Sequence, residues 1–348
     1  MAVVPSELKP ASTLRRYSPF VVLDAPLASE VAPRTVERAV RVMVQASRLP
    51  WVVVGGIHEV CGVEQTARRV AGAGGAFCLR SGEGMGDEWA VVEYLPGLAA
   101  SLVGRDPLKT VVSCHIYTGD VGRFPRVLFR GHHAFVQQGA QHEHSRYLPL
   151  PTLGKATAPA EWPGDETPFT FVWHGIVNAR KGLQGLVSAF WRARQTSPRL
   201  RLLLLGSTGA PWADRAIAQQ VASRAGDGLE VDFRPAWTDD ALRRRLAEAN
   251  AFAYADELDK EQSAAVQDVL GFGKPVLTSA RTCHDDTRGW CWTMGQDPAP
   301  DLVCLAARRD DYECAARRAW LGGSYRQPEL IARAYRAAIL QAFLDAHM

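Results

Sequence analysis

The chain has 348 residues, of which 47% are hydrophobic and 22% are charged. This composition is that of a globular protein, and the length suits two domains better than a single core. The formal net charge is only +3, and basic and acidic residues are interspersed along the chain. Nucleic-acid-binding proteins normally carry a dense basic stripe, so the sequence argues against that class of protein.

The sequence does not indicate a membrane protein or a zinc protein. The first residues lack the apolar run of a signal peptide, and the longest apolar runs are strand-sized rather than membrane-spanning. The seven cysteines do not have the paired spacing of a zinc site, and reduced thiols are the simplest interpretation. We therefore expect a cytoplasmic protein that reaches at most the inner surface of a membrane.

Residues 1–50 form an N-terminal extension to which the sequence assigns no role. Beyond it, short apolar runs alternate with amphipathic stretches, and the clearest helical pattern covers Leu183–Thr196, with apolar side chains on one face. Strands that alternate with helices predict parallel α/β sheets covered on both faces. The runs that we interpret as buried strands are Trp51–Val54, Ala76–Leu79, Val111–Cys114, Phe169–Trp173, Leu202–Leu205 and Val276–Thr278.

The stretch Leu150–Pro168 contains four prolines and few large apolar residues. Such a composition breaks regular structure and is typical of a linker between domains. We therefore predict an N-terminal Rossmann-like domain over residues 51–155 and a C-terminal one over residues 156–325. A helical pattern over residues 326–348 closes the chain.

The segment Phe171–Gly206 combines a strand, a polar loop and the start of a helix. The strand ends at Gly175, and Lys181 and Gly182 are expected to open the helix. A helix N-terminus carries unpaired N–H groups and a partial positive charge, so it favours a phosphate, and Lys181 adds a full charge. From this segment alone, Lys181 is either a phosphate ligand or a solvated lysine in the first helical turn.

The segment Ala251–Ser279 contains a short strand, an acidic loop and a helix that begins near Gln262 and Ser263. Ser263 has the side chain of a helix N-cap, and the free amides behind it favour a diphosphate. Asp268 lies further along the same helix, where its carboxylate can accept hydrogen bonds from ribose hydroxyls. Taken singly, Ser263 is explained as well by a plain cap and Asp268 by a solvated carboxylate.

Together the two segments resemble the C-terminal nucleotide-binding domain of the retaining family-four glycosyltransferases. In that family, a strand, a glycine, a loop, a Lys-Gly pair and a helix precede a second strand that ends in glycine. A loop with a carboxylate or a Gln-Ser pair, a helix and a Gly-x-Pro-Val turn follow later. The residues of this chain in the same order and spacing are Gly175, Lys181, Gly182, Gly206, Gln262, Ser263, Gly273, Pro275 and Val276.

The N-terminal half resembles the same family more faintly. Gly55–Arg69 is similar to the family's first loop between a strand and a helix, where small glycines, here Gly62, let donor and acceptor approach. Val111–Tyr117 resembles the strand whose terminal histidine, here His115, lies over the donor sugar. The alternative for His115 is a purely structural role.

The resemblance implies the GT-B fold, in which two Rossmann-like domains with parallel sheets face each other across a cleft. It implies transfer of a sugar from a nucleotide-diphosphate donor, with retention of configuration and without a metal or another cofactor. The acceptor is a saccharide, a lipid-linked molecule or a small molecule. The catalytic residues implied are His115 and Lys181, and the donor-binding residues are Gly62, Gly175, Arg180, Lys181, Glu261, Gln262, Ser263 and Asp268.

Two positions depart from the family pattern. Asn178 stands where members often have arginine, and Lys260 stands where many have the first of two glutamates. These departures favour an alternative function, a catalytically degenerate GT-B module that binds a nucleotide sugar without turnover. A third interpretation is an epimerase or hydrolase of sugar nucleotides with the same fold.

Two further stretches contain clustered basic residues or histidines. The basic and apolar run Arg123–Arg130 indicates either contact with anionic lipid or a solvated helix face over the core. Four histidines lie close together in the sequence, but their irregular spacing gives no ligand geometry, and we predict no metal site. These histidines are His132, His133, His142 and His144.

Overall fold

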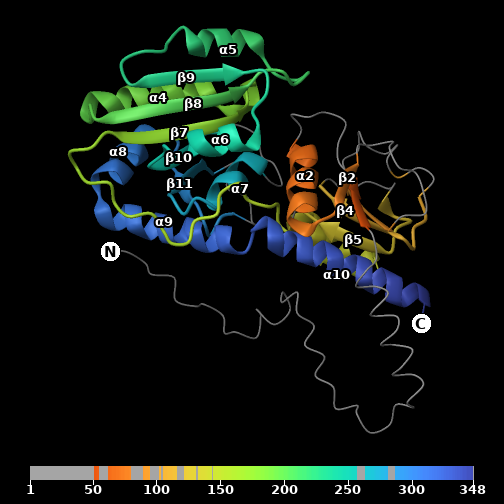
Figure 1. The fold of residues 1–348 in the computed structure, drawn as a ribbon. Helices are drawn as coiled ribbons and strands as arrows, with labels where there is room; N and C mark the ends of the chain where they lie inside the picture. The colour runs from red at the N-terminus through yellow and green to blue at the C-terminus, as the bar shows by residue number, and fades with distance from the viewer. Residues whose placement is uncertain are drawn as a thin grey trace.

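The computed structural model describes residues 51–54, 62–79, 89–94, 102, 105–115, 121–130, 132–142, 144–256, 263–280 and 287–347. These residues form two lobes that lie side by side, each built on one parallel sheet (Figure 1). The two sheets confirm the predicted α/β class with two Rossmann-like domains. Residues 1–50 lie outside the described part of the chain.

The N-terminal lobe contains a parallel sheet with the strand order β2-β1-β3-β4-β5-β6. In that order its strands are Phe77–Leu79, Trp51–Val54, Trp89–Tyr94, Thr110–Cys114, Arg126–Phe129 and His144–Tyr147. Its helical segments are α2 (Gly62–Gly74), α3 (His132–Gln138) and the short 3₁₀ turn η4 (Gly139–Gln141). The chain adds β2 on one side of β1 and then β3 on the other, so the direction of strand addition reverses between β1 and β3.

The C-terminal lobe repeats this plan with the strand order β12-β11-β10-β7-β8-β9, again parallel throughout. In that order its strands are Trp292–Met294, Val276–Ser279, Ala251–Tyr254, Phe169–Ile176, Leu200–Ser207 and Leu229–Arg234. Its helical segments are η5 (Ala179–Lys181), α4 (Leu183–Thr196), α5 (Arg215–Ala222), α6 (Asp239–Leu246), α7 (Ala264–Leu270), α8 (Ala299–Ala307) and α9 (Arg309–Ser324). Here the strand order reverses between β7 and β10.

The chain crosses between the lobes twice, and the two crossings are hydrogen-bonded to each other. The predicted linker runs extended after β6, and the N–H of Thr152 donates to the carbonyl of Arg326 over 2.8 Å. Arg326 lies between α9 and α10 (Pro328–His347), which follow each other from the C-terminal lobe to the N-terminal lobe (Figure 1). Thus the last helix belongs to the first lobe.

Packing explains why α10 returns to the N-terminal lobe. Together with α2 it covers one face of the first sheet, where apolar side chains of all three form a buried cluster. Trp89 of β3 meets Phe343 of α10 edge to face, with ring centroids 5.5 Å apart. The other members of this cluster include Val53, Val91, Val111 and Leu128 from the sheet and Ile331, Tyr335 and Ile339 from α10.

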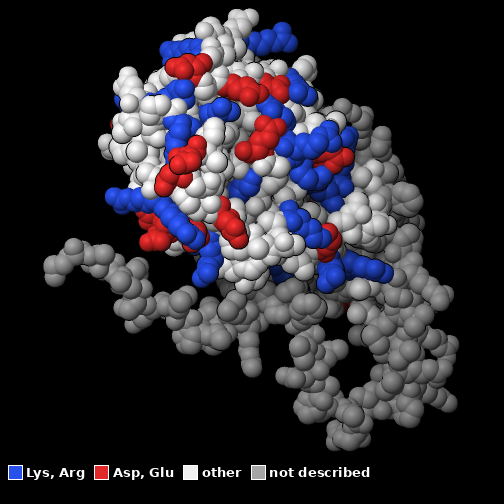
Figure 2. All heavy atoms as spheres, turned by 60° about the vertical axis from the view of Figure 1, so that its left-hand side comes forward, with Lys and Arg blue, Asp and Glu red and all other residues white. Residues whose placement is uncertain are grey.

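The structure corrects the interpretation of Arg123–Arg130. This stretch contains strand β5 rather than a helix, and the side chains of Arg126 and Arg130 are buried, with Arg126 paired to Asp345 of α10 over 2.6 Å. Of the three arginines in this stretch, Arg126 and Arg130 are therefore not available as a basic surface for lipid, and Arg123 is exposed. Across one face of the C-terminal lobe, basic and acidic side chains are interspersed (Figure 2). Among the described helices, none is long and apolar enough to cross a membrane.

Candidate functional site

The carboxyl ends of β7 and β10 define the candidate site. Ligands of open parallel sheets generally bind where the strand order reverses, at the carboxyl edge, because the loops there diverge to opposite faces of the sheet. Gly175 lies at the end of β7, and Asp256 follows β10 by two residues. On the other side of β7, an open pocket of about 600 Å³ is lined by Gly209–Arg215, just beyond the carboxyl end of β8.

Lys181 turns its side chain toward the loop after β10. Its Nζ lies 2.9 Å from Oδ2 of Asp256, and the two side chains are only 12% and 1% exposed. This position excludes the interpretation of Lys181 as a solvated lysine of the first helical turn. The backbone also differs from the expectation, because Lys181 ends the turn η5 and α4 begins two residues later, at Leu183.

Gly182 explains how the two loops come together. Its φ of 58° is in the left-handed region, and a Cβ at this position would lie 1.8 Å from the carbonyl oxygen of Ala255. Only glycine combines that conformation with so close an approach. The Lys-Gly pair therefore allows the loop after β7 to touch the loop after β10, which places Lys181 beside Asp256.

Arg180, on the same turn, is exposed, and its N–H donates to the side chain of Asn178 over 3.1 Å. Asn178 thus caps the turn η5. Gly175 has a φ of 146°, and a Cβ there would be in ordinary contact with Trp173 and Ala265. The structure therefore brings Lys181, but not the side chain of Arg180, into the buried part of this edge.

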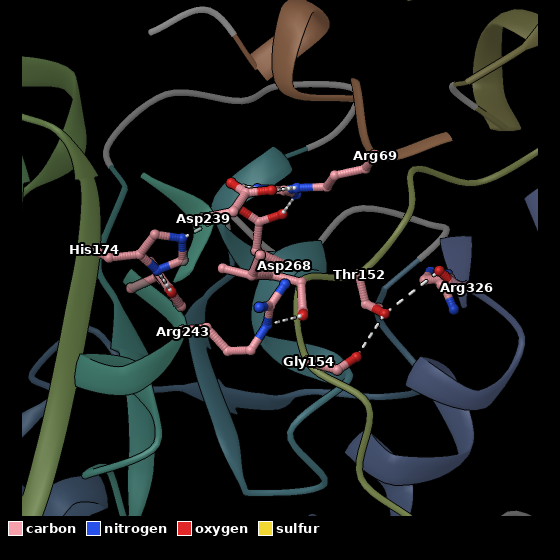
Figure 3. Close-up of polar contacts among 10 residues, drawn as sticks. Arg69, Thr152, Gly154, His174, Asp239, Arg243, Asp268 and Arg326 are labelled. Atoms are coloured by element: carbon pink, nitrogen blue, oxygen red, sulfur yellow. Dashed lines mark hydrogen bonds and ion pairs between the residues drawn. The ribbon is translucent and has the colours of Figure 1, made fainter. Parts of the chain in front are cut away.

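Asp268 lies in a buried chain of polar contacts (Figure 3). Its Oδ2 is 3.4 Å from Nε2 of His174 on β7, and Nδ1 of His174 is 2.5 Å from the hydroxyl of Tyr254 on β10. Burial and the neighbouring carboxylates raise the pKa of Tyr254, so its hydroxyl keeps its proton beside Nδ1. A carboxylate only accepts hydrogen bonds, so Nε2 of His174 is the donor to Asp268.

The other oxygen of Asp268 is paired with Arg69 of α2, in the N-terminal lobe. Burial alone would raise the pKa of Asp268, but Arg69 and His174 outweigh burial and hold this pKa below its usual 3.8. The carboxylate predicted to bind ribose is thus charged and already engaged. Sequence reasoning missed Arg69, because its partner lies 199 residues away, and missed His174, although it directly precedes Gly175.

Arg69 also holds the first residue of α6. Its Nε is 2.7 Å from Oδ2 of Asp239 and its Nη2 is 3.0 Å from Oδ1, a bidentate arrangement. The Arg69 side chain is 8% exposed although it bridges two lobes. Its pKa is raised above the usual value, because the two carboxylates outweigh the effect of burial.

Ser263 occupies the predicted cap position of α7 but does not cap the helix with its side chain. Its φ and ψ of −120° and 111° are those of a cap residue, yet no backbone N–H of the helix donates to its hydroxyl. The Oγ is buried and has no hydrogen-bond partner among the described residues. The neighbouring Glu261 and Gln262, and Lys260, lie outside the described residues.

In the N-terminal lobe, His115 directly follows β4 at the carboxyl edge of the sheet and is 6% exposed. Its Nε2 lies 2.8 Å from Oε2 of Glu93, on the neighbouring strand β3. Gly62 is the first residue of α2 and lies near the strand-order reversal of this lobe. Both predicted residues are therefore at the edge where ligands bind.

Comparison with known proteins supports the fold. No family model matches the chain, and no curated protein matches it. Among solved structures, it is similar to Anabaena Alr3699/HepE in complex with UDP-glucose, with 12% identity over 82% of this chain and 98% of that chain and a TM-score of 0.59. It is also similar to AviGT4, a glycosyltransferase involved in avilamycin A biosynthesis, with 16% identity over 85% of this chain and 98% of that one and a TM-score of 0.55.

A third similar structure is the pneumococcal O-GlcNAc transferase GtfA in complex with UDP and GlcNAc, with 12% identity, a TM-score of 0.52 and coverage of 73% of this chain. The chain spans 57% of the length of that GtfA structure. At such low identities the likeness concerns the fold. The chain has the GT-B fold of these glycosyltransferases, with two parallel sheets in two lobes.

Proposed function

We propose that the protein is a glycosyltransferase that takes a sugar from a nucleotide-diphosphate donor bound at the carboxyl edge of the C-terminal sheet. The observation that carries this proposal is the position of Lys181. Its ammonium pairs with the buried Asp256, at the carboxyl ends of β7 and β10. Similar structures of the same fold contain UDP or UDP-glucose. A buried cation at a strand-order reversal suits an anionic ligand of that kind.

The proposed chemistry follows from charge. When the glycosidic bond to the donor breaks, negative charge grows on the leaving diphosphate, and a fixed cation nearby stabilises it. Lys181 supplies that cation without the cost of reorganising water, because it is already largely withdrawn from solvent. We propose transfer with retention of configuration, which needs no protein nucleophile if the leaving phosphate takes the proton of the acceptor hydroxyl.

The other donor contacts belong to the same proposal. Asp268 would bind ribose hydroxyls with the lone pairs that Arg69 and His174 leave, and the hydroxyl of Ser263 would bind a phosphate oxygen. We keep Gly175, Arg180, Glu261 and Gln262 as donor-binding predictions. In the N-terminal lobe, Gly62 and His115 would face the donor sugar across the cleft. Saccharides, lipid-linked molecules and small molecules all remain candidates for the acceptor.

Nucleotide binding provides the first test. UDP, GDP and dTDP are added separately while thermal unfolding is followed, since a ligand that binds only the folded state raises the melting temperature. We expect one of them to stabilise the wild-type protein. Replacing Lys181 by alanine should weaken its affinity about tenfold to a hundredfold, the usual effect of losing one charge-assisted hydrogen bond. Lys155, whose side chain is 68% exposed and pairs with Glu329 over 2.7 Å, provides the matched Lys155→Ala control.

Turnover separates the enzyme from the degenerate alternative. UDP-glucose is incubated with the protein, with and without a cell extract as the source of acceptors, and released UDP is measured. Release that depends on Lys181 supports a transferase. Nucleotide binding without UDP release would support a module without turnover. The absence of both binding and release would refute both proposals.

A further inference from the structure

Glu93 is a charged residue inside the N-terminal lobe, next to the candidate residue His115. It lies on β3 and its side chain is completely buried. Its Oε2 lies 2.8 Å from Nε2 of His115, and its Oε1 lies 3.1 Å from Nη2 of Arg130. The hydroxyl of Tyr335, on α10, donates to the same Oε1.

Strand register explains why these side chains meet. Glu93 and Ser113 are direct partners of the parallel pair β3 and β4, and His115 follows Ser113 by two residues, so that all three lie on one face of the sheet. Arg130 directly follows β5, and its N–H donates to the carbonyl of Cys114 over 2.9 Å. Further back along the same face, β3 and β4 carry apolar residues that pack on α2 and α10.

This polar group therefore begins where the apolar face reaches the carboxyl edge of the sheet. Apolar residues of similar volume would fill such a place at no cost of desolvation, whereas a buried charge is tolerated only when it is paired and hydrogen-bonded. Here the pairing is extensive: Nε of Arg130 donates to Oγ of Ser113 over 2.8 Å, and Ser113 lies 2.9 Å from the hydroxyl of Tyr335. The arrangement keeps Glu93 charged, since Arg130 and His115 outweigh burial and lower its pKa.

A charged Glu93 decides which nitrogen of His115 carries a proton. A carboxylate only accepts hydrogen bonds, so Nε2 of His115 must be the donor, and in the neutral ring Nδ1 is then the acceptor. We propose that Glu93 is a positioning residue that fixes the ring of His115 in the Nε2–H tautomer and leaves Nδ1 to accept a hydrogen bond from a sugar hydroxyl. The part of this proposal that concerns the sugar rests on the proposed function, but the tautomer does not.

The C-terminal helix contributes to the same arrangement. Tyr335 of α10 contacts Glu93 and Ser113, and the guanidinium of Arg130 lies over its ring, 5.0 Å from the centroid. Arg130 also donates to the carbonyl of Pro149, the residue before the predicted linker, over 2.6 Å. Residues next to both crossings between the lobes, Pro149 and Tyr335, therefore contact the network that orients His115.

The tautomer is measured by nitrogen-15 NMR of the histidine rings of the whole protein, with the signals of His115 identified by their loss in a His115→Asn variant. We expect the neutral ring of His115 to carry its proton on Nε2 and none on Nδ1. A His115 ring with its proton on Nδ1 alone would overturn the proposal, and this measurement needs no substituted Glu93.

Substitution tests the role of Glu93. In Glu93→Gln the shape is kept, but the new amide can donate to Nε2, so the ring should lose its single tautomer. If UDP-glucose is turned over by the wild type, kcat for UDP release should fall about tenfold to a hundredfold in this variant with little change in KM, the range seen when metal-bound histidines lose such a partner. Unchanged tautomer and unchanged kcat would overturn the proposal. Tyr335→Phe, which removes only a hydroxyl, gives a milder form of the same test if Glu93→Gln fails to fold.

A similar carboxylate pair at the amino edge of the same sheet provides a matched control. Asp345 of α10 pairs with Arg126 over 2.6 Å and with His144 over 3.5 Å, so one carboxylate again joins an arginine and a histidine of neighbouring strands. Both partners start their strands and therefore lie at the amino edge, about 13 Å along β5 from the network of Glu93. Asp345→Asn should leave the tautomer of His115 and kcat unchanged. If the wild type releases no UDP, the proposed function fails, while the tautomer still decides the role of Glu93.

Discussion

Arg69 of the N-terminal lobe and Asp268 of the C-terminal lobe form a buried ion pair across the boundary between the lobes (Figure 3). Both side chains are 8% exposed. The same guanidinium binds Asp239 in a bidentate manner, so that one residue of α2 holds both α6 and α7. The lobes are therefore fastened to each other beside the predicted donor site by polar contacts rather than by the covalent crossings alone.

Removing Arg69 should destabilise the protein strongly. In Arg69→Ala the buried carboxylate of Asp268 loses its cation, and breaking a buried pair in this way typically costs about 3–5 kcal/mol. The measurement is urea unfolding followed by tryptophan fluorescence, combined in a double-mutant cycle with Asp268→Asn. Arg309→Ala is the control, because Arg309 is 71% exposed and forms an ordinary helical pair with Glu313. Equal losses in the two arginine variants would contradict the assignment of Arg69 as an interlobe tie.

The same pair predicts how stability depends on pH. The folded protein holds the pKa of Asp268 below 3.8, while the unfolded chain has the ordinary value, so on acidification the unfolded state binds the proton first. The stability that this carboxylate contributes is complete above its ordinary pKa and is lost as the pH falls towards the folded-state value. Unfolding free energies measured between about pH 6 and pH 3 should therefore fall less steeply for Asp268→Asn than for the wild type. Parallel curves would show that the pKa of Asp268 does not change on folding.

The loop that carries Lys181 gives a prediction with an internal control. Gly182→Ala should destabilise the protein by more than about 1 kcal/mol, because alanine is strained at positive φ and its Cβ would overlap the carbonyl of Ala255. Gly185 lies three residues later on α4, and a Cβ there would meet nothing within 4 Å. Gly185→Ala should therefore stabilise the helix by about 0.5–1 kcal/mol. Thermal unfolding of both variants provides the test. Melting temperatures that shift in the same direction would contradict the assigned role of Gly182.

Sequence patterns predicted the C-terminal lobe best because its elements have clear local signals in the sequence. The helix predicted over Leu183–Thr196 has these bounds in α4, and the strand predicted over Phe169–Trp173 forms most of β7. Alternation of apolar runs with helices was sufficient to predict parallel sheets. The glycines of the motif were informative because close backbone contacts, such as that of Gly182 with Ala255, leave room for no other residue.

The N-terminal lobe was harder to predict because its decisive contacts are distant in the chain. The sequence patterns predicted no strand over Trp89–Tyr94 and no role for Glu93, whose partner Tyr335 is 242 residues away. In the same way, Arg126 looks like a surface residue, but α10 brings Asp345 against it. A local sequence pattern cannot predict that a charged residue is buried when its partner lies far away in the chain.

Ser263 and Thr238 both precede helices of the C-terminal lobe, but only Thr238 caps its helix in the expected way. The side chain of Thr238 accepts from the N–H of Ala241 over 3.3 Å, whereas the buried hydroxyl of Ser263 has no partner among the described residues. Thr238→Ala should therefore cost about 1 kcal/mol of unfolding free energy. Ser263→Ala should be neutral or slightly stabilising, because it removes an unsatisfied buried group.

Binding distinguishes an idle hydroxyl from one that is kept for a ligand. If Ser263 contacts a phosphate oxygen of the donor, as we propose, Ser263→Ala should weaken the affinity for UDP roughly fivefold, which corresponds to about 1 kcal/mol for one hydrogen bond. Stability and UDP affinity would then change independently of each other in a single variant. A loss of stability as large as that of Thr238→Ala would mean that Ser263 caps α7 after all. Unchanged stability together with unchanged UDP affinity would remove Ser263 from the proposed site.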